Sequence, residues 1–169
     1  KQSLDEVVKT CPGTEESKKA LELIAFIERK APEIKLEEDK KIAATLFVGD
    51  TTSLLTFCMV ITDNKINVNQ VSFDVISYNI DNYTNRNFRT DGNLTDNRYV
   101  IVYVSGFSDN TEAWDYYRAF SPDKVLRNPS AGGVMTFLIS SGNRTILETE
   151  KNPERYVLFF RDNYLNGRE

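Results

Sequence analysis

The sequence predicts a helical hairpin followed by a domain of the α+β class. One observation is a change in composition near residue 41: residues 1–41 hold 19 charged residues and one aromatic, whereas residues 42–169 hold 18 aromatics and all 15 Asn. The other is the order of hydrophobic patterns in residues 42–169, where short runs of β-forming residues alternate with stretches of helical spacing. A chain of 169 residues is long enough for one such domain with an appended hairpin.

Residues 1–41 predict a helix, a turn and a second helix. Pro12-Gly13 breaks the chain and Thr14 suits a helix N-cap. An apolar stripe at helical spacing follows, formed by Ala20, Leu23, Ile24, Ile27 and Ala31. Pro32 predicts the end of this helix, and the charged stretch Glu33–Lys41 predicts a linker.

Two interpretations of this hairpin remain open. It is either a simple helical hairpin or, because Val7–Ser17 followed by Ala20 resembles the turn and second half of a tetratricopeptide repeat, the end of a repeat region. A single partial repeat cannot bury its own apolar face. In the second case we expect further repeats before Lys1 in the intact protein.

Four segments of the second part predict strands. Leu54–Thr62 is a continuous apolar run typical of a strand buried on both faces, and Tyr99–Ser105 is rich in β-branched and aromatic residues. The polar region Arg86–Asn97 holds a partner strand with turn residues around it. Val134–Ser140 is another strand, and Ser141-Gly142-Asn143 predicts a turn that pairs it with Thr145–Glu148 as a hairpin.

The helices of the second part decide its topology. Asp109 with Glu112 starts an amphipathic helix that ends at Phe120, and Asn152-Pro153-Glu154 starts a C-terminal helix. Val68–Tyr78 fits either a helix or a strand by its period. If it is a helix, the order becomes βαββαβ, which is a ferredoxin-like sandwich with an extra hairpin strand and a C-terminal helix.

Composition excludes several classes of function. Histidine is absent, which excludes Ser-His-Asp and Cys-His catalysis and removes the commonest zinc ligand. The net charge of -4 argues against binding to a phosphate backbone, so we expect no nucleic acid partner. With no histidine, two cysteines and no glycine-rich phosphate-binding motif, we also expect no metal and no cofactor. Whether Cys11 and Cys58 pair stays open, although the apolar run around Cys58 favours a buried free thiol.

Three further features have a functional and a simpler structural interpretation, and the simpler one is favoured for each. Glu148 and Glu150 could form an acid pair of the kind found in sugar-cleaving sites, or face solvent. Gly132-Gly133 could be a binding loop or a turn. Three sequons could carry glycans or hold turn and cap asparagines, at Asn82, Asn93 and Asn143. We therefore expect no enzyme activity.

The candidate binding residues are Tyr99, Ile101 and Tyr103, which share one face of their strand. Such a face could stack nucleobases, contact a protein or a glycan, or form core beneath other elements. The basic and glycine-containing context of an RNA platform is missing, and the core interpretation is favoured.

Short motifs across residues 54–165 occur in the order of a known family: Thr56–Ile61, Lys65–Gln70, Phe73–Val75, Tyr78–Tyr83, Gly106–Asp109 with Ala113 and Asp115–Tyr117, Phe137–Ser140, and Tyr156, Phe159, Phe160 and Tyr164. In this order they resemble the C-terminal region of the tetratricopeptide-repeat lipoproteins of gliding motility and type IX secretion. One departure lies at the first strand, which begins Leu54-Leu55-Thr56-Phe57 where the family has an aromatic-led His-Tyr-Phe.

The resemblance implies a helix at Val68–Tyr78. It also implies a periplasmic, outer-membrane-associated protein, lipid-anchored outside this chain, which acts as a non-catalytic scaffold among the proteins of an envelope secretion complex. Peptidoglycan binding is the alternative, because Val104–Asp109 with Ala113 is similar to the strand-to-helix turn of sporulation-related-repeat domains.

Overall fold

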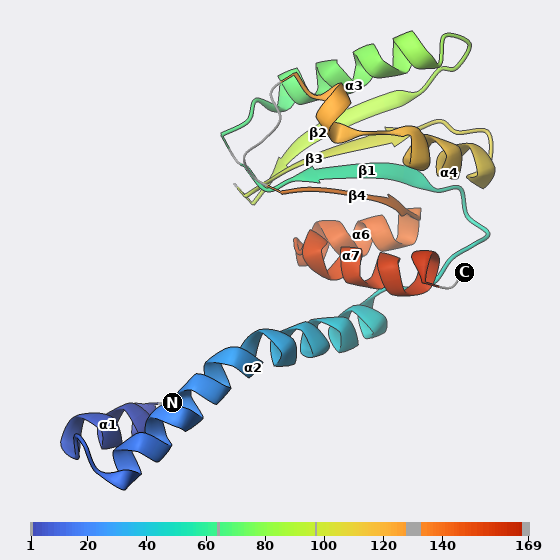
Figure 1. Ribbon diagram of the computed structural model, residues 1–169. Coiled ribbons are helices and arrows are strands. Elements are labelled where there is room, and N and C mark those ends of the chain that lie inside the picture. The colour runs from blue at the N-terminus through green and yellow to red at the C-terminus, as the bar shows by residue number, and fades with distance from the viewer. Residues whose placement is uncertain (1, 64, 97, 128–132, 167–169) are drawn as a thin grey trace. The chain divides into compact units, whose positions relative to one another are not determined.

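The computed structural model describes residues 2–63, 65–96, 98–127 and 133–166 (Figure 1). The chain divides into two compact units, Lys1–Ile42 and Ala43–Glu169, and helix α2 (Glu15–Leu46) crosses the division. Its last residues therefore belong to the second unit. None of the described helices is both long and apolar enough to cross a bilayer.

The first unit contains α1 (Gln2–Thr10), a tight turn and most of α2. Gly13 adopts a φ of +83° in the turn, a left-handed conformation that favours glycine. The Thr14 hydroxyl then accepts a 3.2 Å hydrogen bond from the backbone N–H of Ser17, as an N-cap residue does. The helix, turn and helix predicted for this segment are present.

The predicted end of the second helix at Pro32 is wrong. Helix α2 continues through Pro32 to Leu46, so the stretch predicted as a linker is helical. The Glu and Lys residues on both sides of Pro32 are good helix formers. Lys30 and Glu33 pair across it, one turn apart, with 2.6 Å between Lys30 Nζ and Glu33 Oε2. A helix of 32 residues absorbs the loss of the one backbone hydrogen bond that proline removes.

The second unit is built on one four-stranded antiparallel sheet, which confirms the α+β class. Its strands are β1 (Thr56–Ile61), β2 (Arg89–Thr95), β3 (Tyr99–Ser105) and β4 (Val134–Ile139), in the order β2-β3-β1-β4. In β1, Phe57 lies opposite Val104 of β3 and Leu138 of β4. The continuous apolar run of the sequence therefore forms an inner strand.

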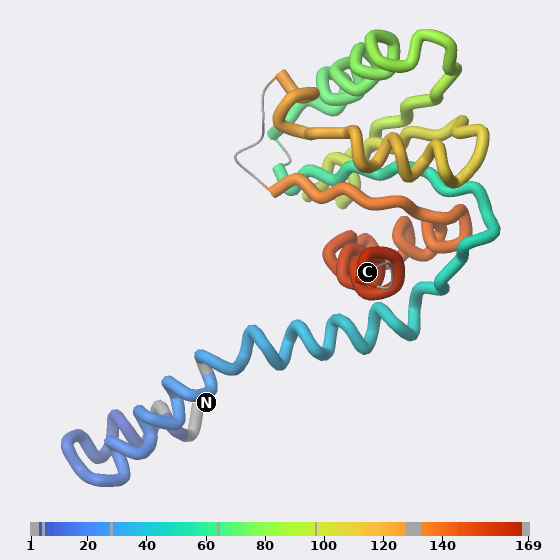
Figure 2. Tube along the Cα trace, turned by 45° about the vertical axis from the view of Figure 1, so that its right-hand side comes forward, coloured from blue at the N-terminus to red at the C-terminus, as the bar shows by residue number. Residues whose placement is uncertain are grey.

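Helices cover both faces of this sheet (Figures 1 and 2). One face carries α3 (Val68–Asn82), α4 (Asn110–Ala119) and the short α5 (Pro122–Val125). The other carries α6 (Ser141–Glu150), α7 (Pro153–Phe160) and one π-helical turn, η1 (Arg161–Leu165). The ambiguous segment at Val68–Tyr78 is thus a helix, as the family resemblance implied.

Alternation along the strands sends side chains into two cores. On the α3–α4 side, the Phe57 ring meets Tyr116 edge-on at 5.0 Å between centroids. On the α6–α7 side, Phe137 meets Tyr156 at 4.8 Å. Cys58 is buried as a free thiol, and Cys11 is an exposed free thiol.

The predicted hairpin strand at Thr145–Glu148 is wrong, because this segment lies within α6. The Ser140 hydroxyl accepts a 3.4 Å hydrogen bond from the backbone N–H of Asn143, so Ser141-Gly142-Asn143 forms the first turn of a helix and not a hairpin turn. Asn143 and Leu147, four residues apart, are the buried positions of this helix.

The segment after α2 is fastened to the α6–α7 side of the second unit. Phe47 packs between Tyr156 and Phe159, with centroid distances of 4.8 and 5.6 Å. The backbone N–H of Val48 donates to the side chain of Asn143 at 3.0 Å, and that side chain donates to the Val48 carbonyl at 2.8 Å. This sequon asparagine therefore serves as a structural clamp.

Candidate functional site

The three residues predicted as a binding face do not lie at the surface. Tyr99, Ile101 and Tyr103 are 3, 4 and 2% exposed and belong to the hydrophobic core. They point to the side of the sheet that α6 and α7 cover, because Arg144 of α6 lies over the Tyr103 ring and Glu154 of α7 binds Tyr99. The structure brings them together as core, which is the interpretation the sequence favours.

The polar end of Tyr99 is occupied within the chain. Its hydroxyl donates to both carboxylate oxygens of Glu154 at 2.8 and 2.9 Å and accepts from the Arg98 guanidinium at 2.9 Å. Burial, followed by the hydrogen bond to Glu154, raises the pKa of Tyr99 to about 12. The hydroxyl is protonated at neutral pH and fixes the start of α7 to the sheet.

Each member of the predicted acidic pair has an arginine beside it. Glu148 and Glu150 lie on α6, where Glu148 accepts a 2.8 Å ionic hydrogen bond from Arg144 and Glu150 lies 3.8 Å from Arg155. Each carboxylate is neutralised by its own arginine. Across the described parts of the chain, no cluster of three Cys, Asp or Glu residues is suited to hold a metal ion. Gly132 of the glycine pair lies outside the described residues.

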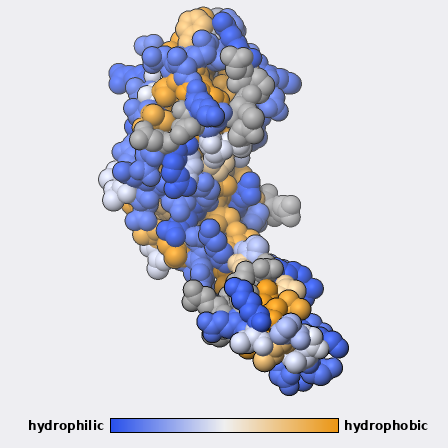
Figure 3. Space-filling view, turned by 90° about the vertical axis from the view of Figure 1, so that its left-hand side faces the viewer, coloured by the Kyte–Doolittle hydropathy of each residue, from blue (hydrophilic) through white to orange (hydrophobic). Residues whose placement is uncertain are grey.

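The exposed apolar side chains place a candidate binding surface at helix α3 and strand β2. Seven large hydrophobic side chains are exposed among the described residues of the second unit, and four of these lie on α3 and β2: Phe73, Ile76, Ile80 and Leu94. The three on α3 follow each other at spacings of three and four residues, which places them along one side of the helix. On the face drawn in Figure 3, which views the left-hand side of Figure 1, hydrophobic and hydrophilic groups are interspersed.

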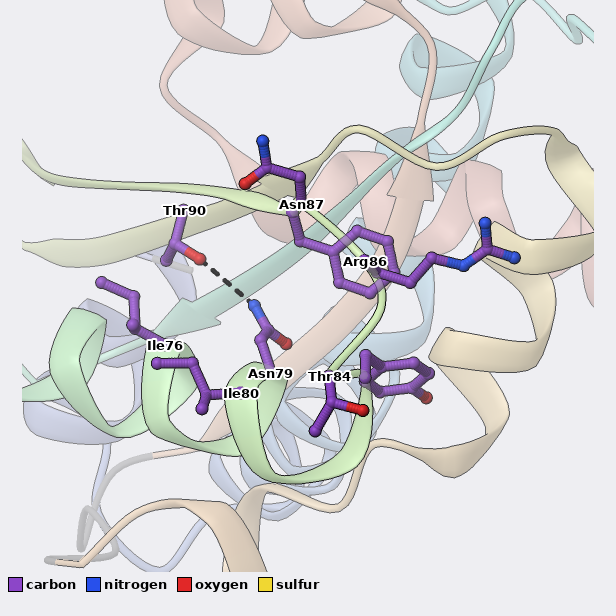
Figure 4. Close-up of a pocket in the computed structure, with 9 residues that line it drawn as sticks. Ile76, Asn79, Ile80, Thr84, Arg86, Asn87 and Thr90 are labelled. Carbon is purple, nitrogen blue, oxygen red and sulfur yellow. Dashed lines mark hydrogen bonds between the residues drawn. The ribbon is translucent and has the colours of Figure 1, made fainter.

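A pocket of about 340 Å³ opens between the C-terminal half of α3, the following loop and the start of β2 (Figure 4). It is lined by Ile76, Asn79, Ile80, Tyr83, Thr84, Arg86, Asn87, Phe88 and Thr90. In the close-up, Ile76 and Ile80 extend from α3 beside Thr90 of β2. The floor is polar, because the Asn79 amide donates to the Thr90 hydroxyl at 3.3 Å.

The cation of this pocket is already paired. Arg86 Nε lies 2.6 Å from Glu112 Oε1, and an Arg86 terminal nitrogen donates to the Ser108 hydroxyl at 3.2 Å. An anionic ligand would have to displace Glu112, which also accepts a 2.6 Å hydrogen bond from the Ser108 backbone. The pocket therefore suits an uncharged, partly apolar group better than an acid.

Strand β2 supplies the second half of this surface, because it lies at the end of the sheet. No other strand of the described residues pairs with its outer edge. At the opposite edge, beside β4, Trp114 of α4 stacks on Phe160 of α7 at 5.8 Å, which joins the helices of the two faces. We call the outer side of α3, the pocket and the free edge of β2 the α3–β2 surface.

Close packing sets the width of the pocket. At Gly92, α3 approaches β2 so closely that an added Cβ would overlap the Ser72 hydroxyl and lie 3.0 Å from Val68 Cγ1. At Thr90, the longer Asn79 side chain bridges the helix and the strand instead. The two elements therefore diverge from Gly92 towards Thr90, and the pocket lies at the open end.

Sequence reasoning missed the α3–β2 surface, although one signal was present. Helix α3 has buried residues at Val71, Val75 and Asn79 and a second apolar row at Phe73, Ile76 and Ile80. A helix with apolar groups outside its core-facing stripe is typical of a second interface.

No protein-family model, curated protein or solved structure matches this chain.

Proposed function

We propose that this chain is a non-catalytic protein-interaction module, a scaffold within a periplasmic envelope complex of type IX secretion and gliding motility. The observation that carries the proposal is the α3–β2 surface, where exposed apolar side chains lie beside an unpaired strand edge. Both are features of protein contact sites. The cellular setting rests on the family resemblance of residues 54–165.

The second unit is assigned to the ferredoxin-like architecture within this proposal. The strand order β2-β3-β1-β4, with α3 and α4 as the two connecting helices, supports that assignment. The extra elements are α6 and α7. They add a third layer, where an open sheet face would otherwise remain.

The first unit is assigned to the end of a tetratricopeptide-repeat region. Its support is the exposure of Leu23, Phe26 and Ile34 on α2, which are 47, 49 and 58% exposed. Neighbouring repeats bury side chains of this kind when they stack. The intact, lipid-anchored protein would then present the second unit at the end of a repeat array, in contact with other envelope proteins.

Peptidoglycan binding, the alternative, requires an exposed sheet face with aromatic and polar groups. Helices lie against both faces of this sheet, and the Tyr99, Ile101 and Tyr103 side chains are buried. This arrangement favours contact with proteins at the edge of the sheet over contact with a glycan on its face.

The test is affinity capture from cross-linked, solubilised cell envelope with three baits: the native chain, Ile80→Glu and Leu54→Glu. Ile80 and Leu54 are 63 and 60% exposed, so neither charge disturbs the core, and only Ile80 lies on the α3–β2 surface. We expect identified secretion-complex proteins on the native and Leu54→Glu baits and their loss on Ile80→Glu. Sedimentation of the chain with peptidoglycan sacculi, with no protein captured, would overturn the proposal.

A further inference from the structure

The free edge of β2 lacks two of the devices that protect an edge strand, a proline and a bulge. The strand is seven residues long, contains no proline, and pairs with β3 in an unbroken register from Arg89 opposite Ser105 to Thr95 opposite Tyr99. Such edges recruit another strand. We propose that a second copy of this chain is the occupant, with β2 pairing antiparallel to β2 of that copy around a twofold axis at Thr90. This inference rests on the proposed function, because it assigns a partner to the same α3–β2 surface: the dimer, and not the single chain, would then contact the other envelope proteins.

The charges of β2 select the register. Arg89 and Asp91 are exposed and share the face opposite α3, because Thr90 between them and Gly92 after them face α3. An axis at Arg89 would place two arginines opposite each other, and an axis at Asp91 would place two aspartates opposite each other. An axis at Thr90 places Arg89 opposite Asp91 of the second copy, twice, and so forms two favourable cross-strand pairs.

The apolar row on α3 fits the same arrangement. Helix α3 contacts β3 as well as β2, so its axis lies inward of the edge. Across a twofold axis with strands about 4.8 Å apart, the two α3 helices would lie roughly 10 Å apart, an ordinary packing distance for helices. Ile76 and Ile80 of both copies, now exposed beside the pocket, would meet there and be buried.

A second copy fits this surface better than an unrelated strand does. A twofold contact requires one patch to complement itself, and Arg89 with Asp91 two positions along one strand has that property. The apolar row is likewise presented by both partners. A foreign peptide would have to match the two opposite charges in the same order and bring its own apolar cover for α3.

Cysteine cross-linking tests the axis directly. In the full chain carrying Cys11→Ser, with Cys58 buried, Thr90→Cys places two thiols at the axis, where cross-strand Cα atoms are about 4.5–5.5 Å apart and a disulfide forms readily. Leu94→Cys is the matched control on the same strand. In this register two Leu94 residues lie eight positions apart, roughly 27 Å, and cannot be joined. We expect a disulfide-linked dimer from Thr90→Cys alone.

Charge exchange tests the register independently of any disulfide. Arg89→Asp makes both positions acidic and Asp91→Arg makes both basic, so each variant should self-associate about tenfold more weakly than the native chain. Mixed together, the two variants restore both opposite-charge pairs and should form a heterodimer of near-native affinity. Arg144 of the same chain lies near Asp91 and contributes to its local field, but it is common to the separate and mixed samples.

Sedimentation velocity over micromolar to submillimolar concentrations measures all of these associations. A chain that stays monomeric throughout, a Thr90→Cys variant that cross-links no faster than Leu94→Cys, or mixed charge variants that do not recover would each overturn the inference. If self-association fails while Ile80→Glu still loses the envelope proteins, the second copy is wrong and the proposed function stands. If Ile80→Glu captures the same proteins as the native chain, the proposed function itself fails.

Discussion

The hydroxyl of Tyr116 donates a 2.7 Å hydrogen bond to Oδ1 of Asn79, which ties α4 to α3 in the buried interior. The amide nitrogen of Asn79 in turn donates a hydrogen bond to the Thr90 hydroxyl, which ties α3 to β2. Aromatic rings surround this polar chain: Phe57, Tyr78, Tyr83, Phe88, Phe107 and Phe120 all pack against the Tyr116 ring. The pocket of the α3–β2 surface is built on this cluster.

Tyr116→Phe should lower the free energy of unfolding by about 1–3 kcal/mol, because the buried Asn79 carbonyl loses its donor while the ring packing is kept. Urea unfolding followed by Trp114 fluorescence measures the change. The double variant Tyr116→Phe with Asn79→Leu removes both polar partners and should be less destabilised than the sum of the single changes. A Tyr116→Phe variant as stable as the native chain would show that this hydrogen bond is not maintained in solution.

Gly92→Ala should destabilise the chain by about 1–3 kcal/mol, because its methyl group overlaps the Ser72 hydroxyl and lies 3.0 Å from Val68 Cγ1, so that both side chains must shift. Ser72→Ala removes the obstructing oxygen, and the remaining Ser72 Cβ position lies at an ordinary 3.5 Å from the new methyl group. We therefore expect Ser72→Ala to restore part of the loss in the double variant, since the 3.0 Å contact with Val68 Cγ1 remains. Thermal unfolding of the four chains completes the cycle, and equal losses with and without Ser72→Ala would contradict it.

Tyr99 should make the chain lose stability between about pH 10 and pH 12. An unfolded tyrosine ionises near pH 10, whereas burial and the Glu154 hydrogen bond raise the pKa of folded Tyr99 to about 12. In that window the folded state holds a proton that the unfolded state has lost, so the free energy of unfolding falls as pH rises. Below pH 10 the contribution is complete. Chemical denaturation of the native chain and Tyr99→Phe across pH 8–12 measures it, and parallel curves for the two would refute the assignment.

The second unit should fold without most of α2 but not without its last residues. A chain of residues 43–169 keeps Phe47, which packs on Tyr156 and Phe159. It should unfold cooperatively, with a free energy of unfolding close to that of the second unit within the full chain. A chain of residues 49–169 lacks that ring and should lose about 3–5 kcal/mol, the usual cost of removing a buried Phe side chain. The denaturant midpoints of the two truncated chains measure this difference, and we expect the midpoint of residues 49–169 to be the lower one. Phe47→Ala in the full chain is the control, because it removes the ring without shortening the chain.

Local signals predicted much of the fold correctly. The runs Leu54–Thr62, Tyr99–Ser105 and Val134–Ser140 are strands because β-branched and aromatic residues fill the two-sided core of the sheet. Asp109 and Asn152 cap helices as their side chains suggested, accepting hydrogen bonds from the backbone N–H groups of Glu112 and Arg155. These choices depend on neighbours in the sequence.

The wrong predictions concern competition between signals. At residues 141–150, Ser-Gly-Asn fits a hairpin turn as well as a first helical turn, and the bonding of Asn143 to Val48, which favours the helix, joins residues far apart in the sequence. At Pro32 the helix continues although proline disfavours it, because the charged residues on both sides of Pro32 favour a helix. The α3–β2 surface could not be derived from sequence alone, because it requires knowing which strand ends the sheet and which helix face remains uncovered.

The position of Cys58 gives the protein an internal reporter of its own opening. Burial within β1 raises the pKa of this thiol, so it stays protonated and unreactive while β1 is held between β3 and β4. The exposed Cys11 thiol is accessible to a maleimide dye from the start. The first dye molecule therefore labels the native chain at Cys11. The second labels Cys58, at a rate no faster than that at which the sheet opens. Mass spectrometry of the two labelling steps would time this motion without any engineered probe.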